Sequence, residues 1–165
     1  MPVKTMEDLF VDTLKDIYYA EKQILKALPV MVKKATDAKL KDALETHRQE
    51  TKGQIDRIEQ VFELMDVAAR GKRCDAIEGI IAEAKQHMNE IEDHLVLDAG
   101  MIGSAQAVEH YEMSRYGTLR TWAEELGMPD AAALLEATLK EEKATDLALT
   151  SLAKAVVNIE AEAAL

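Results

Sequence analysis

The stretch LKDIYYAEKQILKALPVMV, residues 14–32, decides the fold class of this chain. Its apolar residues recur every three or four positions, which is the spacing of one face of an amphipathic helix. One position in that apolar stripe, Glu21, is acidic. An unpaired carboxylate that faces the core costs several kcal/mol, so the stripe predicts a long helix whose buried charge is compensated. The stripe consists of Leu14, Ile17, Tyr18, Glu21, Ile24, Leu25, Leu28 and Val32.

The composition of the whole chain agrees with a helical protein. Its 165 residues are 48% hydrophobic and 31% charged, and only 4% are aromatic. Helix-favouring residues abound, while seven glycines and three prolines leave little material for turns. A chain of this length can bury roughly 70% of its unfolded surface as one domain. We therefore expect an all-α fold in a single ferritin-like domain that spans residues 1–165.

The net charge and the number of cysteines limit which classes of partner and which cellular compartment we expect. The net charge of −11 argues against nucleic acid, because phosphate binding requires a basic surface. The single cysteine, Cys74, cannot form an internal disulfide and agrees with a reducing compartment. The start of the chain, MPVKTMEDLF, lacks the apolar segment of a secretory signal, and no membrane-spanning run is present. We expect a cytoplasmic protein with no membrane partner.

Capping signals place the first helix from Thr5 to about Ala35. Thr5 with Asp8 resembles a capping box, and Pro29 inside the helix predicts a local irregularity. A second helix should follow a cap at Asp37.

This second helix should end near Ala69, where Gly71 supplies the stop. The remaining helices are expected at Asp75–Met88, at Leu97–Leu126, and from a break with a cap at Gly127–Asp130 to about Val156.

The lengths of the connections predict the topology. Short connections join the first two long helices and the last two, so each pair should form an antiparallel hairpin. A long connection with a short helix joins the hairpins and can cross the length of the bundle. Two hairpins joined by one long crossover form the ferritin-like four-helix bundle.

Each of the four long helices carries an acidic residue on its apolar stripe. Folding each hairpin about its turn places these residues at one level of the bundle and makes Glu21 correspond to Glu112, and Glu50 to Glu142. Carboxylates gathered there would repel one another unless they share protons, pair with lysine or arginine, or bind metal ions. We favour metal ions over an inter-helix network of ion pairs. The acidic residues are Glu21, Glu50, Glu109, Glu112, Glu142 and Asp146.

Carboxylate oxygens suit hard cations such as Mg, Ca, Mn or Fe, and two divalent ions would neutralise four carboxylates. Gln54 lies one turn after Glu50 and is a candidate ligand on the same helix face. His47 shares that face. Of three interpretations, a metal ligand, a residue that contacts a ligand, or a core histidine with its own hydrogen-bond partners, we favour the second. Tyr18 and Tyr116 are expected to be core residues that hydrogen-bond a carboxylate.

Four stretches of the chain resemble the YciF-type bacterial stress-response family of the ferritin-like superfamily. They are EDLFVDTLKDIYYAEKQILKALP (Glu7–Pro29), LETHRQETKGQIDRIEQVFE (Leu44–Glu63), VEHYEMSRYGTL (Val108–Leu119) and LKEEKATDLALTSLA (Leu139–Ala153). The resemblance covers nearly the whole chain and implies a dinuclear iron or manganese site inside a four-helix bundle, and a homodimer. It implies the same six acidic residues as metal ligands. Related sequences can carry histidine where this chain has Gln54, and an amide is a weaker ligand.

The resemblance assigns no reaction, so two kinds of function remain open. The first is a protein that handles iron or reactive oxygen, with ferroxidase, peroxidase or catalase-like activity on O₂ or peroxide. The second is a non-catalytic, metal-stabilised bundle that acts as a stress-related binding protein. A bundle without metal, whose carboxylates share protons and cations, is a third arrangement.

Overall fold

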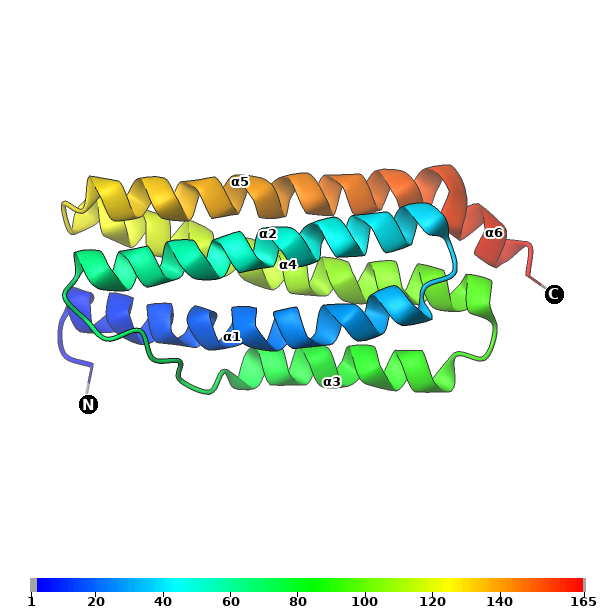
Figure 1. Ribbon diagram of the computed structural model, residues 1–165, viewed down its shortest axis with the longest axis horizontal. Coiled ribbons are helices and arrows are strands. Elements are labelled where there is room, and N and C mark those ends of the chain that lie inside the picture. Colours follow the sequence, from blue (N-terminus) through cyan, green and yellow to red (C-terminus); the bar gives the residue numbers. More distant parts are fainter. Residues whose placement is uncertain (1–2, 165) are drawn as a thin grey trace.

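The computed structural model describes residues 3–164, and the regular elements among them are all helices. Four long helices form a bundle: α1 (Met6–Lys34), α2 (Ala38–Leu64), α4 (His94–Glu125) and α5 (Pro129–Leu152) (Figure 1). Helix α1 packs against α2 and α4, and α5 packs against the same two helices. This confirms the predicted bundle of two hairpins.

The long connection between the hairpins contains α3 (Asp75–Glu90), which lies outside the bundle against α1 and α4 (Figure 1). The C-terminal end differs from the expected plain helix. A π-helical turn (Ala153–Val157) follows α5, and a short α6 (Asn158–Glu162) continues from it. Among the described residues, no helix is both long enough and apolar enough to cross a membrane.

The start of α1 is the predicted capping box. The hydroxyl of Thr5 accepts a hydrogen bond from the Asp8 N–H at 3.0 Å, and the Asp8 carboxylate accepts one from the Thr5 N–H at 3.1 Å. Both backbone donors would otherwise lack a partner at a helix N-terminus. The helix continues through Pro29, whose side chain is exposed.

Helix α2 begins as predicted but ends earlier. The Asp37 carboxylate accepts a hydrogen bond from the Leu40 N–H at 2.8 Å. The helix ends at Leu64 rather than near Ala69, because Asp66 adopts a φ of 54°. The Val67 N–H then donates to the Phe62 carbonyl at 3.0 Å, which closes a Schellman-type C-cap.

Gly71 has a different role from the predicted helix stop. A Cβ atom there would lie 3.2 Å from the Tyr19 Cβ, which is tighter than ordinary contact. Next to it, the Lys72 N–H donates to the Lys15 carbonyl at 3.0 Å. Glycine thus allows the connection after α2 to lie directly against α1.

The turn between α4 and α5 also ends on a left-handed residue. Gly127 has a φ of 70°, and the Met128 N–H donates to the Ala123 carbonyl at 2.9 Å. The predicted side-chain cap is wrong, since Met128 occupies the N-cap position without a side-chain hydrogen bond. Pro129 is the first helical residue, a position at which its missing N–H carries no penalty.

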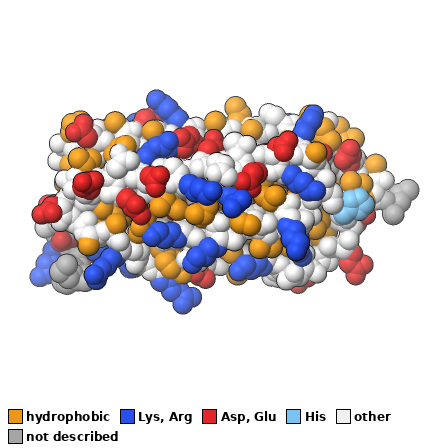
Figure 2. Space-filling model, viewed as in Figure 1, with side chains coloured by type: hydrophobic (Ala, Val, Ile, Leu, Met, Phe, Trp, Pro, Cys, Tyr) orange, Lys and Arg blue, Asp and Glu red, His pale blue; other side chains and the backbone are white. Residues whose placement is uncertain are grey.

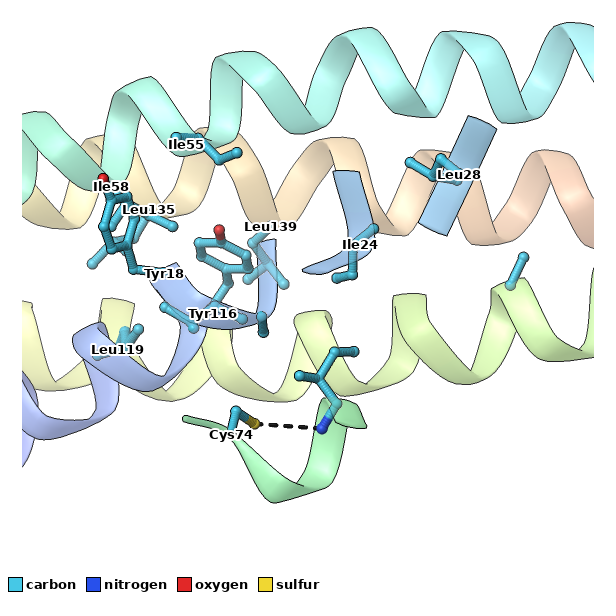
Figure 3. Close-up of a cluster of buried hydrophobic side chains, with 14 of the residues drawn as sticks. Tyr18, Ile24, Leu28, Ile55, Ile58, Cys74, Tyr116, Leu119, Leu135 and Leu139 are labelled. Atoms are coloured by element: carbon cyan, nitrogen blue, oxygen red, sulfur yellow. Dashed lines mark hydrogen bonds between the residues drawn. The ribbon is translucent and has the colours of Figure 1, made fainter. Parts of the chain in front are cut away.

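The core consists of the apolar stripes of the four long helices. Figure 3 shows Tyr18, Ile58, Tyr116 and Leu135 converging from α1, α2, α4 and α5, respectively. Each is buried, and burying such a side chain contributes about 1.5–3 kcal/mol. The same stripes carry the acidic residues, so the packing that forms the core also carries carboxylates into it.

Candidate metal centre

Four glutamates and one histidine are buried in the interior of the bundle, at least one from each long helix. Their exposed fractions are 0% for Glu21, Glu112 and Glu142, 1% for Glu109 and 3% for His47. Glu109 and Glu112 are three residues apart on α4 and therefore share one helix face. The sequence positions on the stripes thus translate into buried carboxyl groups.

Four of these side chains form a group that we call the metal group: His47, Glu109, Glu112 and Glu142. One donor atom of each lies within 4.8 Å of a donor atom of every other. His47 Nε2 is 3.2 Å from Glu109 Oε1 and 4.0 Å from Glu112 Oε2. The group therefore offers three carboxylates and one imidazole around one small volume.

Many polar atoms of this group lack hydrogen-bond partners among the described residues. They include both oxygens of Glu109 and of Glu112, Oε2 of Glu142 and both ring nitrogens of His47. The short His47–Glu109 distance does not have hydrogen-bond geometry. Each buried polar atom left without a partner costs about 1–3 kcal/mol. A cluster of such atoms is typical of a site that binds an additional ligand or ion.

Burial shifts the pKa values of the interior carboxyl groups upward. Burial and then the nearby Glu142 carboxylate raise the pKa of Glu21 to about 8. Burial and contact with Glu142 raise the pKa of Glu109 to about 12. Burial and the neighbouring carboxylates also raise the pKa of Glu112 well above its ordinary range. Without a bound cation these groups therefore retain protons, which a metal ion would displace.

Burial lowers the pKa of His47, although the carboxylates of Glu142 and Glu141 oppose this shift. The imidazole is therefore neutral at pH 7. A neutral imidazole can bind a metal ion through a ring nitrogen. It does not supply the positive charge that the carboxylates would need in an ion-pair network.

Lysine and arginine do not neutralise the interior carboxylates within residues 3–164. Among these residues, His47 is the only basic side chain within 4.0 Å of a carboxylate oxygen of the metal group. Arg57 pairs instead with Glu141, at 2.5 Å between Nη2 and Oε1. The alternative of an inter-helix lysine or arginine network therefore does not describe this site.

Two neutral side chains hold the surrounding carboxylates in place. The Tyr116 hydroxyl donates to Glu21 Oε1, and the Gln54 amide donates to Glu142 Oε1. Gln54 also donates to Glu141 Oε2 at 3.2 Å. Gln54 thus orients Glu142, while its own carbonyl oxygen has no hydrogen-bond partner among the described residues and remains free to act as a ligand.

Three of the six predicted acidic ligands, Glu21, Glu50 and Asp146, lie outside the metal group. Glu50 is half-buried and accepts a hydrogen bond from the Thr145 hydroxyl at 3.2 Å. Asp146 is half-buried and accepts hydrogen bonds from Gln106 at 3.1 Å and from His110 at the same distance. Their role as ligands stays a prediction.

Tyr18 is a core residue that hydrogen-bonds a carboxylate, as predicted, but the carboxylate does not belong to the interior group. Its hydroxyl donates to Glu59 Oε1 at 2.5 Å and accepts from Lys22 Nζ at 2.6 Å. Glu59 and Lys22 are both exposed. Of the two tyrosines, only Tyr116 contacts the candidate centre.

His47, expected to contact a ligand, is itself a member of the metal group. Its position seven residues before Gln54, nearly two helical turns, was the available signal. Which atom of a buried side chain faces a neighbouring helix depends on the packing of both helices, and helix periodicity does not contain that information. For the same reason the contacts of Glu141 with Gln54 and Arg57 were not foreseen.

Comparison with known proteins gives consistent matches. The family model described as a domain of unknown function, DUF892, matches residues 5–162. The protein YciF of Escherichia coli strain K12 is 47% identical over 163 residues, which are 98% of each chain.

Solved structures match the whole fold. The crystal structure of the Escherichia coli stress protein YciF has a TM-score of 0.90 at 47% identity, over 94% of this chain and 99% of that one. The protein YcfI of Rhodopseudomonas palustris has a TM-score of 0.88 at 50% identity, over 90% and 94% of the two chains. A Xanthomonas campestris protein at 23% identity shares the fold, with a TM-score of 0.75 over 97% of this chain and 100% of that one.

Proposed function

The chain belongs to the DUF892 family, and from this premise we propose that it is a stress-response protein whose metal group binds two divalent ions, iron or manganese. The observation that carries the proposal is the set of partnerless donor atoms on four buried side chains. A cluster of this kind is unstable by itself and becomes favourable once cations bind to it.

The charge of the interior residues fits two divalent ions. Four negative charges are available when the carboxyl groups are deprotonated, one from Glu21 and three from the metal group (Glu109, Glu112 and Glu142). They balance the total charge of +4 on two divalent ions. Carboxylates with one imidazole are a donor set that suits manganese and iron. The donor set therefore matches the metals in both charge and chemical type.

The spacing of the donors also fits. Two donors on a single ion lie at most about 4.4 Å apart, twice a metal–ligand bond of about 2.2 Å. Donors separated by up to 4.8 Å can serve one ion after a small contraction, or two ions about 3.5–4 Å apart.

The protein's own residues would hold and orient such a centre. Tyr116 fixes Glu21, and Gln54 fixes Glu142, in each case by donating to Oε1. Arg57 holds Glu141 with two hydrogen bonds, at 2.7 and 2.5 Å, and Glu141 in turn contacts Gln54. Outer contacts of this type typically change metal affinity 10- to 100-fold.

We propose an activity on iron or reactive oxygen, of the ferroxidase, peroxidase or catalase-like type. Bound iron or manganese would supply a redox couple and a Lewis acid for O₂ or peroxide. The buried carboxyl groups would take up and release protons as the charge of the centre changes, because their pKa values depend strongly on neighbouring charge. A relative described as a stress protein agrees with such a role.

Metal analysis combined with activity assays tests this proposal. Protein loaded with Fe(II) or Mn(II) without oxygen should retain about two ions per chain after desalting, and Glu142→Ala should lose them. Glu125→Ala, which removes an exposed carboxylate on α4 by the same substitution, is the control and should retain them. Fe(II) oxidation and peroxide consumption then follow on the loaded protein.

The outcomes separate the candidate functions. Two ions with turnover support the redox activity. Two ions without turnover support the metal-stabilised binding protein instead. Wild-type protein that retains no more metal than Glu142→Ala would overturn the proposal.

A further inference from the structure

A cavity of about 250 Å³ lies between α1, α3 and α4. Its inner end is lined by His47 and Glu109, two members of the metal group. Most of the remaining wall is apolar and comes from all three helices. The apolar lining includes Ile24, Leu28, Met31, Ile81, Met88 and Ala105. The cavity therefore reaches the candidate centre along an apolar wall.

Two lysines, Lys26 on α1 and Lys85 on α3, lie at the outer part of the cavity. Both are exposed, and neither forms an ion pair among residues 3–164. Figure 2 shows lysine and arginine side chains among apolar ones over α1, with acidic side chains interspersed towards α2 and the ends of the bundle, on a chain whose net charge is −11. The one acidic residue of the outer wall, Glu78, is hydrogen-bonded by the Tyr19 hydroxyl.

The volume sets the size of a suitable ligand. An apolar cavity of about 150 Å³ binds benzene in another protein, so a cavity of about 250 Å³ has room for a somewhat larger apolar body. Apolar walls with a few placed polar groups are the general form of small-molecule sites. Two free lysines at the outer part add a preference for an anionic group there.

We propose that this cavity binds an amphipathic carboxylate. Its apolar body lies between α1, α3 and α4, and its carboxylate lies at Lys26 and Lys85. The far end of the apolar body then faces His47 and Glu109. The placement of this apolar end at a metal centre rests on the proposed function, whereas binding of the ligand to the cavity does not.

Calorimetric titration of metal-free protein with decanoate tests the binding. We expect saturable one-to-one binding to the wild type. Ala105→Leu, which fills the cavity from α4, should weaken it at least tenfold, equivalent to about 1.4 kcal/mol. Ala107→Leu, two positions away and exposed, is the matched control and should bind normally. Ala84→Leu fills the cavity from α3 and should also weaken binding, which keeps the test valid if one variant fails to fold.

A second set of variants tests whether the two lysines contribute to binding of the carboxylate. The double change Lys26→Gln with Lys85→Gln should weaken decanoate about tenfold. Lys143→Gln, an exposed lysine on α5, should leave the affinity unchanged. Absence of decanoate binding to the wild type, or equal binding to the filled and unfilled variants, would overturn the cavity as the ligand site.

The orientation is tested on protein loaded with Mn(II). Nuclear relaxation of the terminal methyl protons of decanoate should be enhanced more than that of the protons next to its carboxylate. The opposite order would overturn the proposed orientation of the ligand. Since the metal-free titration needs no ion, failure of metal binding and failure of the cavity proposal give different results.

Discussion

At the scale of single residues, Glu112 shows the conflict between stability and metal binding most plainly. It is completely buried, and neither carboxylate oxygen has a hydrogen-bond partner among the described residues. Such a group lowers the stability of the metal-free protein, and only a bound cation turns it into a favourable interaction. Packing does not explain its presence, whereas the proposed metal binding would.

Replacing this carboxyl group should separate the two effects. Glu112→Gln should raise the unfolding free energy of the metal-free protein at pH 8 by about 1–3 kcal/mol, since the amide needs no proton uptake on folding, whereas the buried carboxyl does. The same variant should lose metal retention. Urea unfolding and metal analysis of the desalted protein measure these effects, with Glu125→Gln as the exposed control on the same helix. A variant that is less stable without metal would contradict this explanation.

Tyr116 acts on the centre through Glu21. Its hydrogen bond lowers the pKa of Glu21 against the raising effect of burial, so Tyr116→Phe should make the Glu21 proton harder to displace. We expect the affinity for Mn(II) to fall about tenfold. Tyr19→Phe removes a comparable hydrogen bond to Glu78, outside the metal group, and serves as the control in a competition titration. Equal affinities of the two variants would exclude this role for Tyr116.

At the scale of elements, the side chains that cap the starts of α1 and α2 could be predicted from the sequence. The Thr5–Asp8 capping box and the Asp37 cap are formed as predicted, because both depend on residues within one turn. Helix ends were less readable. Asp66 ends α2 by adopting a left-handed conformation, for which glycine is the usual residue, so the glycine at Gly71 was the misleading signal. The π-helical turn at Ala153–Val157 left no distinct pattern in the sequence.

Gly53 is a glycine in the interior of a helix, where alanine should be more stable. It lies inside α2 near the half-buried Glu50, and apart from its chain neighbours and the backbone of its own helix no described atom lies within 4 Å of a Cβ placed there. Close packing of helices therefore does not require glycine at this position. Gly53→Ala should stabilise the protein by about 1 kcal/mol through helix propensity. Thermal unfolding measures the change, and a destabilised variant would show that Gly53 is needed for a reason other than packing.

At the scale of the whole molecule, topology was predictable and the detailed ligand set was not. The four stripes and the short turns define two hairpins, which bury Glu21, Glu109, Glu112 and Glu142 together. Periodicity places a residue on a helix face to within part of a turn. Whether a side chain at the edge of that face, such as Glu50, reaches the interior depends on helix rotation and on its neighbours, and Glu50 instead contacts Thr145.

The interior carboxyl groups should make the stability of the whole protein depend on pH. The pKa values of Glu21, Glu109 and Glu112 are raised by folding, so the unfolded chain loses their protons above about pH 4.5 while the folded protein retains them. Their contribution to stability is complete below pH 4.5 and is lost as pH rises, by about 1.4 kcal/mol per pH unit for each retained proton. His47, with a lowered pKa, has the opposite effect, but only below about pH 6.5.

Above pH 6.5, therefore, the raised carboxyl pKa values change the stability with pH and His47 does not. Metal-free protein should unfold at a lower temperature at pH 8 than at pH 6.5. Mn(II) should remove most of this difference, because it binds the deprotonated carboxylates and its affinity rises with pH. Calorimetric scans at both pH values, with Mn(II) and with a chelator, measure the effect. A metal-free protein that becomes more stable from pH 6.5 to pH 8 would contradict the raised carboxyl pKa values.

The most direct test of the central claim is anomalous X-ray diffraction from crystals of the protein loaded with Mn(II). We predict anomalous peaks inside the bundle, within about 2.0–2.6 Å of donor atoms of His47, Glu109, Glu112 and Glu142. Manganese found only on the surface, with these four side chains bonded to one another or to water, would contradict the claim that they form a metal centre.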